Sequence, residues 1–309
     1  MTREMIVPLE SYRLARYIVP IPCYICEEDN TFDAEYCRHC LAPMALAHQA
    51  ASQKLQPRMI AVVGATAVGK TVFLGMLIDM LSRQPEPVQL LTRGAFSITL
   101  QQTTMAALAR CQFPQKTPNE PDRWNWVHCQ LRRSKREPPL ELIVPDMAGE
   151  AIFEEVAHPH SYHVITAYLK KCSGAMILVD AIQLRESSND QEYFAMKLIS
   201  YLAELNDDAK QGWSRRPVAM VFTKADQCEQ CLGDPAAFAA SQASRLWQLC
   251  EERFAQHRFF ASGVAGACAW RETPHDGRVR VPLRVEPAGI VEPFLWLLEQ
   301  IETQRPRSK

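Results

Sequence analysis

The sequence predicts an α/β fold: a mostly parallel sheet with one antiparallel strand, flanked by helices and preceded by a small cysteine-rich module. Two observations carry this prediction. From residue 58 onward, apolar runs of strand length alternate with longer amphipathic segments, which is typical of a sheet covered by helices. Upstream, four of the eleven cysteines fall between residues 23 and 40. We therefore expect a module over residues 1–43, a linker over 44–57, a main domain over 58–303 and a flexible tail over 304–309.

The expected strands are short apolar runs, and the links between them set their direction. They cover residues 59–63, 124–132, 140–144, 175–180, 218–222 and 259–261. Parallel neighbours need a crossover of about a dozen residues or more, whereas antiparallel neighbours can be joined by a short turn. The link over residues 133–139 is too short for a crossover. The second strand should therefore run antiparallel beside the third in an otherwise parallel sheet.

The expected helices fill the segments between these strands. Their apolar residues recur at helical spacing over residues 70–82, 97–111, 165–171, 190–205, 235–254 and 290–301. The segment over residues 83–123 is an irregular excursion around the second of these helices. A connector that is either helical or extended is expected over the Ala- and Gln-rich residues 44–57.

Composition and charge narrow the class of protein. The chain has 309 residues with 34 Lys plus Arg and 35 Asp plus Glu, so its formal net charge is −1. This balance argues against a dedicated electrostatic nucleic-acid binder, although a local basic patch at residues 132–136 keeps nucleic acid a disfavoured option. A 47% hydrophobic share excludes disorder for the bulk of the chain. No apolar run approaches the length of about 18 residues that spans a bilayer, so we expect a soluble, cytoplasmic protein.

A phosphate-binding loop follows the first expected strand. The eight residues match the pattern G-x-x-x-x-G-K-T in full: Gly64, Ala65, Thr66, Ala67, Val68, Gly69, Lys70 and Thr71. Such a loop turns its backbone N–H groups inward on a phosphate chain, and the N-terminus of the following helix adds positive potential. Lys70 is expected to contact the β- and γ-phosphates, and the Thr71 hydroxyl to ligate Mg²⁺.

An acidic residue follows the third expected strand, in the spacing D-x-x-G. Hard cations take oxygen ligands and keep several waters, so Asp146 is expected to hold Mg²⁺ through water. Gly149 has no side chain and can bring its backbone N–H to a γ-phosphate.

Two further strand ends predict which base is bound. The strand over 218–222 leads into Thr223, Lys224, Ala225 and Asp226. The Asp226 carboxylate can accept two hydrogen bonds from guanine N1–H and N2–H₂, each worth about 1.5–3 kcal/mol, whereas adenine offers no such pair. Lys224 is expected to lie along the base or brace the phosphate loop. Ser262 and Gly263, after the last strand, can offer a backbone N–H to guanine O6.

Together these motifs resemble the Ras-like and translation-factor class of P-loop GTPases. G-A-T-A-V-G-K-T, D-M-A-G and T-K-A-D occur in that order, and the resemblance covers residues 58 to about 303. It implies a P-loop GTPase fold, binding of GTP and GDP with Mg²⁺, and a GDP/GTP switch. The four-cysteine module and the long excursion also resemble the predicted double-GTPase family of bacterial conflict systems.

The resemblance further implies a mobile threonine that ligates Mg²⁺ when GTP is bound. Thr117 lies in the loop nearest the second strand, with Thr103 and Thr104 as alternatives inside an expected helix, and a polar loop residue as the other interpretation.

Two positions depart from the family pattern. Thr66 stands where Ras-like proteins often carry glycine, and Glu150 stands where many relatives carry a water-positioning glutamine. A carboxylate beside a triphosphate is unfavourable unless its pKa rises or it acts as a base. We therefore expect slow, partner-dependent hydrolysis, with a non-hydrolysing GTP-binding scaffold as the alternative. A minor alternative is an ATPase.

The upstream cysteines form two C-x-x-C pairs. Cys23 and Cys26 precede Cys37 and Cys40, and two such pairs complete a tetrahedral Cys₄ zinc site. His39 could replace one thiol, and redox dithiols are the main rival. Four thiolates leave no open coordination position, so this module is expected to dock a protein effector or activator rather than to carry out chemistry. A third alternative is a zinc-ribbon nucleic-acid-binding protein controlled by nucleotide. Cys228 and Cys231 are interpreted as ordinary loop thiols, with a second metal site as the alternative.

Overall fold

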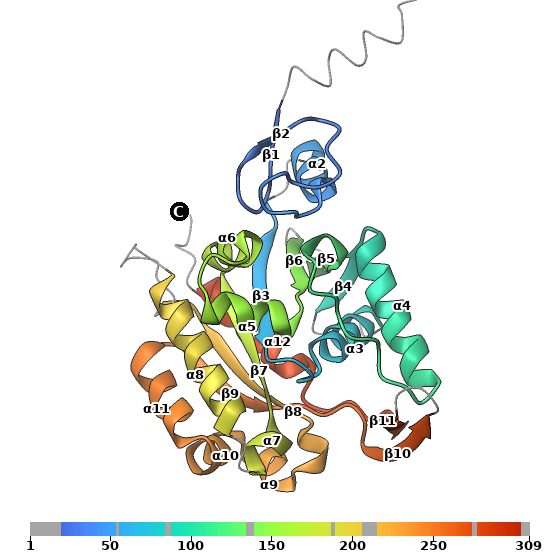
Figure 1. The fold of residues 1–309 in the computed structure, drawn as a ribbon, viewed down its shortest axis with the longest axis vertical. Coiled ribbons are helices and arrows are strands. Elements are labelled where there is room, and N and C mark those ends of the chain that lie inside the picture. Colours follow the sequence, from blue (N-terminus) through green and yellow to red (C-terminus); the bar gives the residue numbers. More distant parts are fainter. Residues whose placement is uncertain are drawn as a thin grey trace, which may run out of the picture.

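The computed structural model describes residues 20–53, 56–83, 88–133, 139–186, 189–205, 215–273 and 277–303. Its centre is a seven-stranded sheet in the order β4-β5-β6-β3-β7-β8-β9 (Figure 1). The strands are β3 Arg58–Gly64, β4 Gln89–Arg93, β5 Asn125–Arg132, β6 Leu140–Asp146, β7 Gly174–Asp180, β8 Val218–Thr223 and β9 His257–Ala261. Strand β5 runs antiparallel to both of its neighbours. The other strands on its far side, β6, β3, β7, β8 and β9, run parallel to one another. The predicted fold class is confirmed.

Helices cover both faces of this sheet. They are α3 Lys70–Arg83, α4 Ala95–Ala109, α5 Gly149–Ala157, α6 His163–Lys171, α7 Ala181–Arg185, α8 Asn189–Glu204, α9 Glu229–Gly233, α10 Pro235–Gln242, α11 Ser244–Arg253 and α12 Val291–Thr303, with 3-10 turns at Pro121–Arg123 and Ala225–Gln227. Alternate residues of β3 enter two cores because successive strand side chains point to opposite faces. Met59 and Val63 pack with α5, α6 and α8, whereas Ile60 and Val62 pack with α3 and α12.

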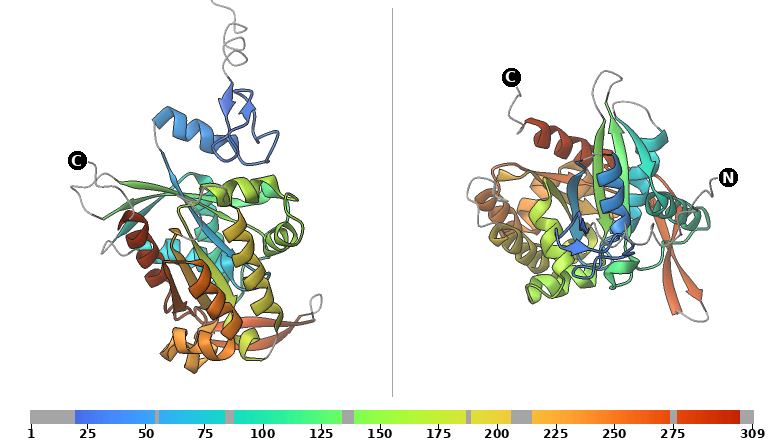
Figure 2. Two further views of the ribbon diagram at one scale, coloured as in Figure 1. Left: turned by 90° about the vertical axis from the view of Figure 1, so that its left-hand side faces the viewer. Right: turned by 90° about the horizontal axis from the view of Figure 1, so that it is seen from above.

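The structure contains three helices that were not predicted, α5, α7 and α9, and it differs from the predicted elements in three further places. The excursion contains β4, which pairs antiparallel with β5 at the sheet edge. The helix expected over 235–254 is two helices, because the backbone at Ala243 (φ −141°) leaves helical geometry between α10 and α11. After β9 the chain forms a hairpin of β10 Ala267–Thr273 and β11 Gly277–Arg284, which projects from the domain (Figure 2).

The cysteine-rich module lies where β3 begins, at the end of the sheet opposite the phosphate-binding loop (Figures 1 and 2). It consists of β1 Ile21–Pro22, β2 Asp29–Asn30 and α2 Met44–Gln53. The Tyr24 hydroxyl donates to the carbonyl of Pro57 over 2.5 Å, and Lys171 Nζ donates to the carbonyl of Tyr24 over 3.1 Å. Met44 is fully buried in the same core as Met59. Part of the predicted linker is thus a packed helix, and the proposed division into domains stays a prediction.

Two predicted segments lie outside the described residues: the chain before residue 20 and the tail over 304–309. In the described part of the chain, no helix combines the length and the apolar character needed to cross a membrane.

Candidate functional site

A cavity of about 410 Å³ lies at the carboxyl ends of the parallel strands. Three loops that follow β3, β8 and β9 line it, together with the loop before β5 and the start of α5. Its wall includes the predicted residues Thr66, Ala67, Val68, Gly69, Lys70, Thr71, Thr117, Gly149, Thr223, Lys224, Asp226, Ser262 and Gly263. Motifs that are scattered over 200 positions of the sequence therefore surround one space.

The phosphate-binding loop wraps around the amine of Lys70. Lys70 Nζ donates to the carbonyls of Gly64 and Ala65, over 2.9 Å in each case. Burial lowers the pKa of Lys70 to about 8, although the nearby Asp146 carboxylate opposes that shift. Gly69 has φ 94°, a backbone conformation that side chains disfavour, so the second glycine of the motif is required by geometry. The loop holds its one positive side chain at the point where a phosphate chain would enter.

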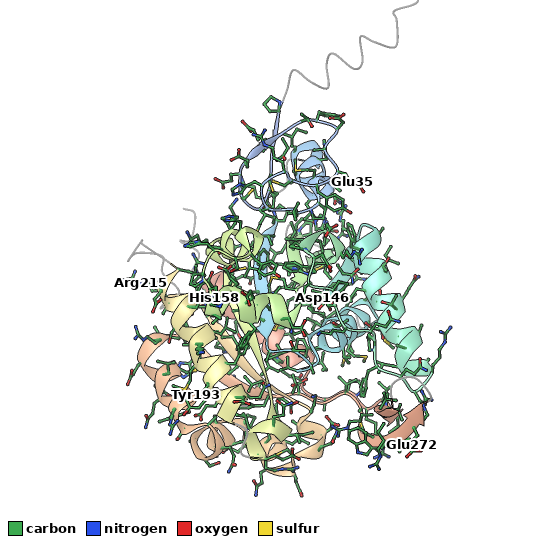
Figure 3. All side chains as sticks on the ribbon, in the orientation of Figure 1. Glu35, Asp146, His158, Tyr193, Arg215 and Glu272 are labelled. Atoms are coloured by element: carbon green, nitrogen blue, oxygen red, sulfur yellow. The ribbon has the colours of Figure 1, made fainter. Side chains whose placement is uncertain are left out.

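Three oxygen-bearing side chains meet beside this loop. Thr71 Oγ1 lies 3.0 Å from Thr117 Oγ1 and 3.0 Å from Asp146 Oδ2, and Thr117 Oγ1 lies 3.1 Å from the same carboxylate oxygen. Asp146 is buried, and burial raises its pKa, while the hydrogen bonds from the two threonines act in the opposite direction. In Figure 3, Asp146 lies between Glu35 of the cysteine-rich module and Glu272 of the hairpin. Two hydroxyls and a carboxylate are the ligand types that Mg²⁺ prefers, so the donor set fits that ion.

The alternatives to Thr117 lie elsewhere. Thr103 Oγ1 donates within α4 to the carbonyl of Thr99, and the hydroxyl of buried Thr104 packs against Gly75. Neither lines the cavity. Thr117 is therefore the threonine of the three that the fold brings to Asp146.

The N-terminus of α5 closes against the phosphate-binding loop. A methyl group placed on Gly149 would lie 2.5 Å from the backbone nitrogen of Thr66, so only glycine permits this approach. The next residue, Glu150, points out to solvent, where it pairs with Lys116 and accepts from Asn119 Nδ2 over 3.0 Å. The hydrogen bond from Lys116 lowers the pKa of Glu150. The pKa of Glu150 is thus lowered, not raised. Its carboxylate is balanced by an ion pair with Lys116, in the loop that carries Thr117.

The other end of the cavity is built by the loops after β8 and β9. The N–H of Ala225 donates to the carbonyl of Ser262 over 3.0 Å, which holds the two loops together. A methyl group on Gly263 would lie 2.6 Å from Asp226 Oδ1, so the Asp226 carboxylate packs directly against this glycine. Lys224, in the left-handed region at φ 56°, pairs with Asp180 at 2.5 Å.

Sequence reasoning missed two groups at this site. Asp180, buried at the end of β7, anchors Lys224 and caps α7 by accepting from the N–H groups of Ile182 and Gln183. Its position after an apolar strand was a readable signal, as it was for Asp146. Arg280 of β11 lines the cavity as well, but it lies in a hairpin that was not predicted.

The four module cysteines form one cluster. The ligand atoms of Cys23, Cys26, Cys37 and Cys40 all lie within 4.8 Å of one another. Cys23 and Cys40 sulfurs are 3.7 Å apart, and those of Cys26 and Cys37 are 3.6 Å apart. Sulfurs at the corners of a tetrahedron with zinc–sulfur bonds of about 2.3 Å are separated by roughly 3.8 Å, so the cluster fits zinc. The hydrogen bond from Cys40 lowers the pKa of Cys23 to about 5, which favours a thiolate.

Two other predicted features, the Cys228–Cys231 pair and the basic stretch at 132–136, add little evidence for a binding site. Among the described residues, the module cysteines are the one group of His, Cys, Asp and Glu side chains close enough to share an ion, so Cys228 and Cys231 gain no partners there. In the basic stretch at 132–136, Arg133 pairs with Glu302, and residues 134–136 fall outside the described residues.

A family model described as Double-GTPase 2 matches residues 58–272, which is more than half of the chain. The chain belongs to the Double-GTPase 2 family. Its main domain is thus a GTP-binding GTPase domain, whereas the cysteine-rich module and β11 lie outside the matched segment. No curated protein matches the sequence.

Solved structures similar to this Double-GTPase 2 chain include two GTP-binding proteins. One is the Arl6 (BBS3) small GTPase from Trypanosoma brucei with the nucleotide analogue GppNp; it is 14% identical, with a TM-score of 0.45, and the match covers 81% of this chain and 100% of that one. The other is nucleolar GTP-binding protein 1 from Plasmodium falciparum, 12% identical, with a TM-score of 0.41 and coverage of 81% and 89%. Membership of the family rests on the sequence match alone.

Proposed function

We propose that this protein is a GDP/GTP switch that hydrolyses GTP slowly, with Mg²⁺ as its cofactor. The observation that carries the proposal is the convergence of Thr71, Thr117 and Asp146 within 3.2 Å of one another, beside the phosphate-binding loop. Thr117 comes from a surface loop, so its place in this cluster ties that loop to whatever occupies the phosphate site. A loop held by such contacts and released without them is the basis of a nucleotide switch.

Each remaining residue has a task in this proposal. Lys70 and the loop N–H groups bind the phosphates, and Gly149 directs its N–H to the γ-phosphate. Thr71 and Thr117 would hold Mg²⁺ directly and Asp146 would hold it through water, and the bound ion would supply positive charge beside the phosphate oxygens. Asp226 accepts from the guanine edge, Lys224 is held beside the base by Asp180, and Ser262 and Gly263 face guanine O6.

Slow hydrolysis is proposed because of what surrounds Glu150. A carboxylate that pairs with Lys116 and has a lowered pKa is a weak base, and it occupies the position where relatives orient water with glutamine. Thr66 lines the cavity, and a side chain at this position would crowd a γ-phosphate. These two observations also favour the second candidate, a non-hydrolysing GTP-binding scaffold.

We further propose that the cysteine-rich module binds zinc and docks a protein partner. Phe32 and Leu41 leave 42% and 45% of their surface exposed on this small module, which gives a partner apolar contact area. His39, between two of the cysteines, packs against His163 at the start of α6 with ring centroids 4.9 Å apart. The module therefore touches the segment that follows α5, which supports a route from a docked partner to the nucleotide site.

Single-turnover hydrolysis separates the two candidates. The purified protein, loaded with γ-labelled GTP and Mg²⁺, is followed for phosphate release with and without extract from the source cells. Slow release that the extract accelerates supports the switch. No release in either condition supports the scaffold, and release at ordinary enzyme rates of about 10 per second without extract contradicts both.

A further inference from the structure

The β10–β11 hairpin contributes two side chains to the nucleotide cavity, and none of the sequence motifs includes them. Trp270 pairs with Arg280 and Cys268 pairs with Pro282, so these four side chains share one face of the hairpin. Cys268 and Arg280 both line the cavity, and Arg280 is half-buried. Arg278 lies on the same face one step nearer the tip; it is exposed, and its guanidinium lies 5.8 Å from the centroid of the Trp270 ring. Arg280 thus reaches the cavity, whereas its neighbour does not.

Four basic side chains line the cavity, and three of them have partners. Lys70 donates to two carbonyls of its own loop, Lys116 pairs with Glu150, and Lys224 pairs with Asp180. Arg280 forms no ion pair with any residue in the described part of the chain. A half-buried guanidinium without a protein partner loses hydration and gains nothing in return unless a ligand supplies acceptors.

The surroundings of Arg280 identify which end of a nucleotide it meets. Its companion Cys268 lies 3.6 Å from Gln227 Nε2, and that amide lies 3.4 Å from Asp226 Oδ2. The hairpin therefore joins the cavity at the loop expected to recognise guanine, not at the phosphate-binding loop. A planar guanidinium can stack on a purine ring and donate hydrogen bonds in its own plane.

We infer that Arg280 is a nucleotide-binding residue that covers the base and ribose end of bound GTP or GDP. This inference rests on the proposed function of the cavity. It assigns a role in the site to β11, a strand that lies beyond the segment matched by the family model.

The test compares Arg280→Ala with Arg278→Ala, which removes an equal charge from the same face of the same strand. Affinities for GTP and GDP are measured by calorimetry on the nucleotide-free full chain. Arg280→Ala is expected to weaken both nucleotides by the same factor, about ten- to hundredfold, and Arg278→Ala to change them by less than about twofold. Arg280→Gln, which keeps most of the stem, serves as a second variant if alanine destabilises the hairpin.

Three results would overturn the inference. Unchanged affinities in both Arg280 variants would remove Arg280 from the site, and equal losses in the Arg278 variant would reduce the effect to general electrostatics. A loss confined to GTP would place the guanidinium at the γ-phosphate instead of the base. Wild-type protein that binds neither nucleotide would contradict the proposed function itself, which separates that failure from the failure of Arg280.

Discussion

The hydroxyl oxygens of Thr71 and Thr117 lie 3.0 Å apart, although 46 positions separate the two residues in the sequence. Both also lie within hydrogen-bond distance of Asp146. Thr71 is the second residue of α3, the helix that follows β3, and Thr117 lies in the loop before β5. The fold thus brings a hydroxyl from this loop and a hydroxyl from α3 to a single carboxylate.

Thr117→Ala should weaken GTP binding more than GDP binding. A threonine that ligates Mg²⁺ only in the triphosphate state contributes to one affinity and not to the other, so we expect a loss of about tenfold or more for GTP and about twofold or less for GDP. Thr103→Ala is the matched control, because its hydroxyl is used within α4. Equal losses for both nucleotides, measured by calorimetry with Mg²⁺, would show that Thr117 does not sense the γ-phosphate.

Nucleotide binding should take up protons near pH 8. Burial lowers the pKa of Lys70 from 10.5 to about 8, so roughly half of the amines are neutral at that pH in the free protein. Bound phosphate favours the ammonium form and raises this pKa, so affinity should fall as pH rises above about 8 and uptake should approach half a proton at pH 8. Calorimetry in buffers of different ionisation enthalpy measures this number. Proton release, or no exchange at all, would contradict the assigned contact.

Glu150→Ala should leave the basal hydrolysis rate within about threefold of wild type. The Glu150 side chain is about half exposed, at 46%, and Lys116 lowers the pKa of its carboxylate, so its loss removes no effective base. The same substitution should loosen the contact between the Thr117 loop and α5, which faster amide exchange over residues 113–120 would report. A fall of about a hundredfold in the single-turnover rate would instead establish Glu150 as the catalytic base.

The protein should contain one zinc ion per chain that depends on the cysteine cluster. Cys23→Ser is expected to lose this metal and lower the melting temperature, because small modules draw most of their folding energy from it. Cys111→Ser, at an exposed thiol far from the cluster in sequence, should keep the full metal content. Elemental analysis of the wild type and both variants under reducing conditions measures the zinc content. A wild type without metal, whose thiols react freely with a thiol reagent, would favour the redox alternative.

The elements predicted correctly are those with a local signal. The short link over 133–139 was enough to orient β5 against β6, and the register Asn125↔Asp146 to Leu131↔Leu140 confirms it. The hairpin was not predicted because β11 alternates between basic and apolar residues instead of forming an apolar run. Arg278, Val279, Arg280 and Val281 follow that alternation, and an Asp-Gly pair at 276–277 marks a turn, so the signal was present.

The functional site likewise contains residues that a local sequence motif predicts and residues that it does not. The phosphate-binding loop and the carboxylates at strand ends could be predicted because each is a short motif at a fixed place relative to a strand. The pairs Lys116–Glu150 and Lys224–Asp180 could not, since they depend on which loops the sheet order brings together. The choice of Thr117 over Thr103 came from family resemblance, because no spacing rule links it to Thr71.

Selective binding of guanine nucleotide tests the central claim most directly. Nucleotide-free protein is titrated with GTPγS and ATPγS in the presence of Mg²⁺, alongside the Asp226→Asn variant. The account predicts one site per chain, at least about a hundredfold preference for GTPγS, and loss of that preference in the variant, because Asp226 supplies two charged hydrogen bonds to guanine alone. Equal affinity for the two nucleotides, or a preference that survives in Asp226→Asn, would contradict it.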